Sequence, residues 1–103
     1  MLFMVKIDVE LTPEMPQEQK DSLRKAENAR ACEMIEAGKM KRIFRIVGTT
    51  SNYGIWEADT LEELHANIGS LPLFPWLRVQ VWPLIEHPVT ASWLETHDEM
   101  PAF

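Results

Sequence analysis

With 103 residues, of which 46% are hydrophobic and 25% charged, the chain has the size and composition of one globular domain with a modest core. Its net charge of −6 argues against a nucleic-acid-binding protein, and no apolar run approaches the roughly 20 residues that a transmembrane helix needs. The single cysteine, Cys32, excludes an internal disulfide and, with an N-terminus that lacks signal-peptide features, predicts a cytoplasmic protein.

A half-buried strand is predicted for residues 2–10, where hydrophobic and polar residues alternate. Residues 16–37 are predicted to form a long helix, which starts at a proline and stops before a glycine. On this helix, Glu27 and Arg30 fall on the side that carries the apolar residues. A carboxylate there is costly unless it is paired or functional. Two interpretations stay open: an ion pair of Glu27 with Arg30 at the edge of the core, or a functional carboxylate.

The middle of the chain is predicted to form a hairpin, with strands at residues 41–47 and 52–58 around a short turn. Ile43 and Arg45 share one face of its first strand. The sequence Thr60-Leu61-Glu62-Glu63 is a capping box, which predicts the start of a second helix.

The second helix is followed by a rigid crossing to a strand at residues 77–82, because Pro72 and Pro75 cannot continue a helix or a strand ladder. Phe74 and Trp76 lie in this crossing. Two interpretations stay open for these aromatic residues: they belong to a buried connector, or they line a pocket or an interface.

The predicted order βαββαβ is the split βαβ arrangement, so we expect an α+β, ferredoxin-like fold. Two helices would cover one face of a four-stranded antiparallel sheet. Because the other face mixes polar and apolar residues, we expect self-association through the sheet. Residues 1–88 would form the domain, and residues 89–103 a C-terminal arm that packs on its own or a neighbouring subunit. A second possible capping box at Ser92 predicts a short helix in this arm.

Several signatures of cofactor and metal sites are missing from the sequence. It has no glycine-rich phosphate loop, no histidine pair at metal-binding spacing and no CxxC motif. We therefore expect neither a cofactor nor a metal. These residues alone indicate a small oligomeric α+β domain with a possible Glu/Arg site, and they name no substrate.

Five short segments carry a resemblance to a known family. They are Met1-Leu2-Phe3-x-Val5-Lys6, Arg45-Ile46-x-Gly48-x-x-x-Asn52-Tyr53, Glu63-Leu64-His65, Leu71-Pro72-Leu73-Phe74-Pro75 and Leu84-x-x-His87-Pro88. In register from about residue 1 to residue 88, these segments resemble muconolactone delta-isomerase. The resemblance implies the same ferredoxin-like fold, no cofactor, and a homo-oligomer built from dimers, such as a decamer, with pockets at subunit contacts. It also implies isomerisation of muconolactone to the 3-oxoadipate enol-lactone, in the β-ketoadipate pathway of bacterial aromatic catabolism.

The implied reaction takes a proton from one ring carbon and returns it to another. It needs a base whose pKa is raised by burial, a donor or cation at the lactone carbonyl, and a cation for the carboxymethyl group of the substrate. By resemblance, Glu27 is the proton shuttle, Arg45 binds the carboxylate or the oxyanion, and Asn52 donates to the carbonyl. Lys6 would assist Arg45. The remaining predicted substrate contacts are Met4, Phe74 and Trp76.

Three departures from the family bear on these roles. Met4 and Thr50 stand where the family often has His and Tyr, which would favour a bulkier or less polar substrate if both residues line the pocket. Arg30 replaces an apolar residue and, if paired with Glu27, would lower the pKa of that carboxyl group. Two alternatives to the isomerase therefore stay open: a dehalogenase of halogenated muconolactones or an isomerase of a related lactone, and a non-catalytic ligand-binding module.

Overall fold

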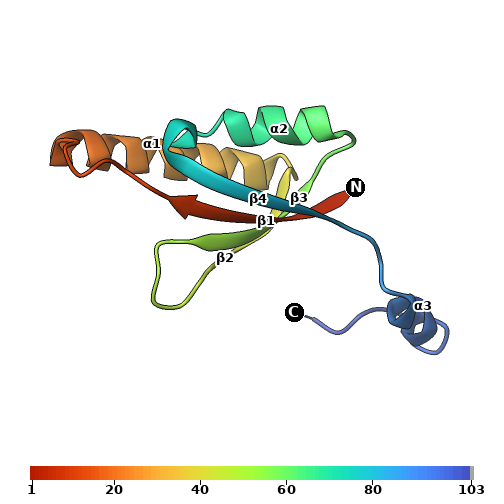
Figure 1. Cartoon of the computed structure of the whole chain (residues 1–103). Coiled ribbons are helices and arrows are strands. Elements are labelled where there is room, and N and C mark those ends of the chain that lie inside the picture. The colour runs from red at the N-terminus through yellow and green to blue at the C-terminus, as the bar shows by residue number, and fades with distance from the viewer. Residues whose placement is uncertain (103) are drawn as a thin grey trace.

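The computed structural model describes residues 1–102 and contains a four-stranded sheet and three α-helices (Figure 1). In chain order the elements are β1 (Leu2–Val9), α1 (Gln17–Glu36), β2 (Met40–Arg45), β3 (Asn52–Glu57), α2 (Leu61–Gly69), β4 (Leu77–Leu84) and α3 (Pro88–Leu94). The first six elements follow the predicted order βαββαβ. No helix within these residues is long and apolar enough to cross a membrane.

The strands are arranged in the order β2-β3-β1-β4, and each neighbouring pair is antiparallel. The helices α1 and α2 cover one face of this sheet, as Figure 1 shows. This is the predicted ferredoxin-like arrangement. The last strand runs two residues beyond the predicted 77–82 and includes Pro83. A proline is tolerated there because β4 is an edge strand of the sheet.

The core lies between the sheet and the helices. Alternate residues of β1, namely Phe3, Val5 and Ile7, point toward the helices and are buried. Leu64 and Ile68 of α2 complete the core on one side of the sheet. Burial of each large apolar side chain contributes about 1.5–3 kcal/mol, so this face holds the domain together.

The long helix α1 packs more loosely than α2. Met34 is its only buried residue, whereas the nine-residue α2 buries two. The side of α1 that faces the sheet instead carries Glu27 and Ala31, which are half-buried. A short side chain and a polar side chain leave space between α1 and the sheet.

A β-bulge determines which residues of β2 face this space. The register shifts between Met40 and Arg42, so that Met40 pairs with Trp56 while Arg45 pairs with Asn52. Residues 40 and 45 would point to opposite faces of a regular strand, because side chains alternate. The extra residue at the bulge brings both to the side covered by the helices.

The ends of the helices are fixed by local hydrogen bonds. The Thr60 side chain accepts a hydrogen bond from the Glu63 backbone N–H at 3.0 Å, which confirms the predicted helix start. The Glu63 carboxylate also binds Lys39 Nζ at 2.6 Å, which links the turn between α1 and β2 to the start of α2. Gly38 has φ +74°, a conformation that favours glycine, and ends α1 as predicted.

The helix α3 lies away from the sheet at the end of an extended segment (Figure 1). It begins at Pro88 and not at Ser92, because the His87 side chain caps it by accepting a hydrogen bond from the Val89 N–H. The ring of Trp93 in this helix stacks on the ring of His97 beyond its end, with the centroids 3.5 Å apart. The arm therefore has local structure of its own.

Candidate active site

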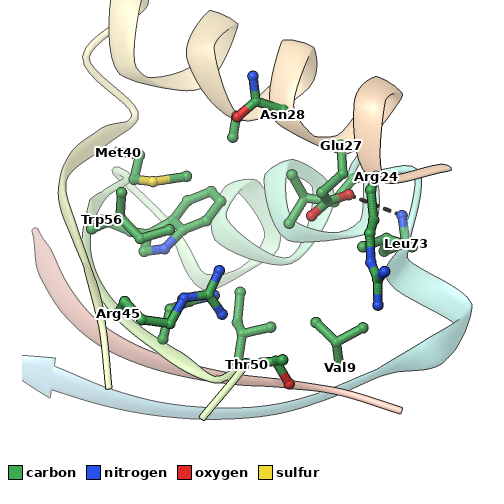
Figure 2. A pocket seen from close by; sticks show the side chains of 14 residues that line it. Val9, Arg24, Glu27, Asn28, Met40, Arg45, Thr50, Trp56 and Leu73 are labelled. Carbon is green, nitrogen blue, oxygen red and sulfur yellow. Dashed lines mark hydrogen bonds between the residues drawn. The ribbon is translucent and has the colours of Figure 1, made fainter. Parts of the chain in front are cut away.

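The space between α1 and the sheet is a cavity of about 430 Å³, drawn in Figure 2. Every strand except β4 contributes to its wall, together with α1 and the segment after α2. The lining residues are Ile7, Val9, Arg24, Glu27, Asn28, Ala31, Met40, Ile43, Arg45, Thr50, Asn52, Trp56, Leu71 and Leu73. A cavity of this size accommodates a small organic molecule.

Glu27 is the only acidic residue among those that line the cavity. Its carboxylate is half-buried, and its Oε1 accepts a hydrogen bond from the Leu73 backbone N–H at 2.9 Å. Desolvation raises the pKa of Glu27 above its ordinary value, and the hydrogen bond from Leu73 opposes this rise only in part. The carboxylate is therefore a stronger base than an exposed glutamate.

The ion pair between Glu27 and Arg30 that the spacing allowed does not form. Arg30 Nη1 instead donates to Glu33 Oε2 at 2.7 Å, and Arg30 Nε donates to Ser70 Oγ at 3.1 Å. These partners hold the guanidinium outside the cavity, whose lining does not include Arg30. Of the two interpretations of Glu27, the structure thus favours the functional carboxylate.

Arg45 and Asn52 face the cavity from neighbouring strands, as paired residues of β2 and β3. Asn52 Oδ1 is buried without a hydrogen-bond partner in the part of the chain that the structure describes. Three of the sequence-predicted site residues, Glu27, Arg45 and Asn52, are thus brought to one cavity by three different elements. Thr50, at the end of the β2–β3 hairpin, also lines it.

Four further predicted contacts do not reach this cavity. Met4 and Lys6 lie on the opposite face of the sheet, because β1 points its alternate residues Phe3, Val5 and Ile7 toward the helices. Lys6 instead pairs with Asp8 on the same strand, with Nζ and Oδ2 3.8 Å apart. Of Met4 and Thr50, the two departures expected to shape the pocket, only Thr50 therefore lines the cavity in this subunit.

Phe74 and Trp76 lie in the crossing between α2 and β4 and do not line this cavity. Phe74 contributes to a second hollow of about 390 Å³, where its ring and that of His65 form a T-shaped contact with a centroid distance of 6.2 Å. The other residues of this hollow are apolar: Leu61, Leu64, Ile68, Leu77, Val79 and Val81. Trp76 lines neither hollow.

Sequence reasoning missed several residues of the site. Arg24 lies one helical turn before Glu27, and this i−3 spacing was the signal that could have identified it. Trp56 forms an apolar wall and is 1% exposed, and its Nε1 has no partner among the described residues. Its indole is accommodated by Gly54, where a Cβ atom would lie 2.9 Å from Nε1. The role of the Leu73 backbone N–H could not be predicted, because a backbone group is not marked by any residue type.

Within residues 1–102, no group of three His, Cys, Asp or Glu side chains is arranged to hold a metal ion. The chemistry available in the cavity is that of a half-buried carboxylate beside two guanidinium groups and two amides. Such a set can remove and return a proton next to a carbonyl group, while the cations stabilise negative charge on oxygen.

Comparison with known proteins identifies relatives over most of the chain. The family profile of muconolactone delta-isomerase matches residues 1–90. The muconolactone delta-isomerase of Cupriavidus pinatubonensis is 39% identical over 88 residues, which cover 85% of this chain and 96% of that protein. The enzymes of Acinetobacter baylyi and Rhodococcus opacus are 39% and 35% identical, and the matches cover 85% and 84% of this chain and 92% of each relative.

The fold is also similar to a solved structure. The crystal structure of muconolactone isomerase superimposes with a TM-score of 0.81 at 33% sequence identity. The match covers 85% of this chain and 92% of that one.

Proposed function

We propose that this chain, which belongs to the muconolactone delta-isomerase family, isomerises muconolactone to the 3-oxoadipate enol-lactone through proton transfer by Glu27. The protein is an isomerase of aromatic catabolism by its family. The observation that carries the proposed mechanism is the position of Glu27, a half-buried carboxylate with a raised pKa that is the only acid among the described residues lining the cavity.

The reaction moves a double bond within a five-membered lactone ring. A base removes the proton from the ring carbon that bears the carboxymethyl group, and the electron pair passes through the ring to the carbonyl oxygen as a dienolate. The same proton, now on the base, is returned to the ring carbon next to the carbonyl. No atom is gained or lost. A single carboxylate over one face of the ring can reach both carbons, so one acid–base residue is enough.

Desolvation prepares Glu27 for this role. Because its pKa is raised, the carboxylate has a higher proton affinity than that of an exposed glutamate. The Leu73 N–H holds one carboxylate oxygen and leaves the other available to the ring. The adjacent apolar walls, among them Leu73, Met40 and Trp56, exclude water from the intermediate.

Arg45 and Asn52 would stabilise the dienolate. As paired residues of neighbouring strands on the same face, they can donate to one oxygen atom from two directions. Donors of this kind typically contribute about 10²- to 10³-fold to kcat. Lys6 takes no part in this mechanism within one subunit, since it lies on the other face of the sheet.

We further propose that the protein is a cytoplasmic homo-oligomer built from dimers. The uncovered face of the sheet supports this assembly, because Tyr53, Trp82 and Leu84 are 37%, 43% and 36% exposed there. The C-terminal arm would pack on a neighbouring subunit, since α3 lies away from its own sheet and exposes Val89 and Leu94. Sedimentation equilibrium of the full chain tests the assembly, and a monomer at micromolar concentration would refute it.

The test of the proposed function is ultraviolet monitoring of muconolactone with the purified protein beside Glu27→Gln. Turnover by the wild type that the variant lacks supports the isomerase mechanism. Release of halide from a chlorinated muconolactone, without turnover of muconolactone itself, would show a dehalogenase instead. Binding of both lactones without turnover of either would show a non-catalytic ligand-binding protein.

A further inference from the structure

Two arginines face the cavity, and neither guanidinium group has a hydrogen-bond or ion-pair partner among the residues that the structure describes. Arg24 of α1 and Arg45 of β2 both line it, and within residues 1–102 neither side chain forms a hydrogen bond or an ion pair. In Figure 2 their guanidinium groups lie apart, that of Arg45 to the left and that of Arg24 to the right, with Glu27 above them. The single acidic residue of the lining is bound to the Leu73 N–H and leaves both cations available to a ligand.

The substrate of the proposed reaction has two separate centres of negative charge. The carboxymethyl group is a carboxylate throughout, whereas the carbonyl oxygen becomes negative only while the proton is on the base. Their ring carbons flank the ring oxygen, so the two groups point away from each other. One arginine therefore cannot serve both charges.

The two arginines differ in what stands beside them. Arg45 has Asn52 as its partner on the neighbouring strand, and this pair of donors suits a single oxygen atom. Arg24 projects from α1, and the other donor side chain that this helix contributes to the cavity is Asn28, one turn further along. The guanidinium of Arg24, with its planar fork of N–H groups, suits a carboxylate, which it can bind through two parallel hydrogen bonds.

We propose that Arg24 binds the fixed carboxylate of the substrate and thereby makes the site specific for anionic lactones, an inference that rests on the proposed function. The division of roles fits the chemistry of the ring. The carbon that bears the carboxymethyl group is the one that loses its proton, and Arg24 lies one helical turn from Glu27. An anchor at Arg24 therefore brings the reacting carbon beneath the base.

The test measures binding without turnover. The probes are the saturated counterpart of muconolactone, in which the ring double bond is reduced, and its methyl ester. Neither can isomerise, so the affinities do not depend on whether the protein is catalytically active. Isothermal titration calorimetry gives the Kd of each probe for the wild type, Arg24→Gln, Arg24→Lys and Lys25→Gln. Lys25→Gln is the matched control, because it removes an exposed cation from the same turn of α1 that does not line the cavity.

We expect Arg24→Gln to weaken binding of the acid by about 10- to 100-fold and to leave the Kd of the ester within about twofold. Arg24→Lys should recover part of the affinity for the acid, since it keeps the charge but not the fork. Lys25→Gln should change neither Kd by more than about twofold. Equal losses for acid and ester, or a wild type that does not prefer the acid, would overturn the proposal. Failure of the wild type to turn over muconolactone would instead contradict the proposed function, not this proposal.

Discussion

The substitution Glu27→Gln tests the chemistry of the site most directly. Glutamine keeps the size of the side chain and an oxygen that can accept the 2.9 Å hydrogen bond from the Leu73 N–H, but it cannot take up a proton. A general base contributes about 10²- to 10⁴-fold, so kcat should fall by that factor. At about 1.36 kcal/mol for each tenfold change, the barrier rises by about 2.7–5.4 kcal/mol.

The pH dependence of the wild type follows from the same carboxylate. The base acts in its ionised form, so kcat/KM should decline toward acidic pH as Glu27 becomes protonated. Because burial raises the pKa of Glu27, the midpoint of this decline should lie above the ordinary value of 4.5. In Glu27→Gln the residual activity should show no such acidic limb.

The substitution Glu27→Gln should raise the free energy of unfolding at pH 7, although it lowers activity. Since the pKa of Glu27 is higher in the folded than in the unfolded chain, its contribution to stability is complete below about pH 4.5 and is lost as the pH rises through the folded pKa. At pH 7 the ionised carboxylate is therefore a net cost that glutamine removes. The free energy of unfolding of Glu27→Gln should rise at pH 7 by up to about 1 kcal/mol, a small gain because the side chain is only half-buried.

Urea unfolding at pH 7 and pH 4, at one protein concentration, together with initial rates across the same range, gives all three results. Full activity of Glu27→Gln would show that another group is the base. A variant that is less stable than the wild type at pH 7 would show that the ionised carboxylate stabilises the fold, and would contradict the desolvation argument.

The other predictions concern the oxyanion donors and the frame around the cavity. Arg45→Gln should lower kcat by about 10²- to 10³-fold with a smaller effect on KM, and a change confined to KM in steady-state kinetics would contradict its role at the dienolate. Gly54→Ala should destabilise by about 1–3 kcal/mol, because its Cβ would lie 2.9 Å from Trp56 Nε1; an unchanged urea midpoint would show that the indole can move freely. Thr60→Ala removes the side-chain acceptor for the Glu63 N–H at the start of α2 and should cost about 1 kcal/mol, whereas Thr60→Ser should cost little.

Much of the fold could be predicted from the sequence, because periodicity and turn chemistry are properties of neighbouring residues. Alternation predicted β1 and the two strands of the hairpin, and the bounds of α1 were wrong by only one residue at each end. Glu27 was identified because a carboxylate broke the pattern of the sheet-facing side of its helix. The same alternation places Lys6 on the face of β1 away from the core, so its exclusion from the cavity follows from the sequence alone.

The tertiary structure decided the rest, because it depends on contacts between residues distant in the chain. Only the bulge in β2 lets both Met40 and Arg45 face the helices. The partner of Glu27 is a backbone N–H 46 residues away, and no residue type in the sequence identifies it. The sequence by itself thus determined which elements form and in what order, since local pattern encodes them. Which charges meet in the cavity was decided only when the sheet, the bulge and the crossing after α2 were assembled around it.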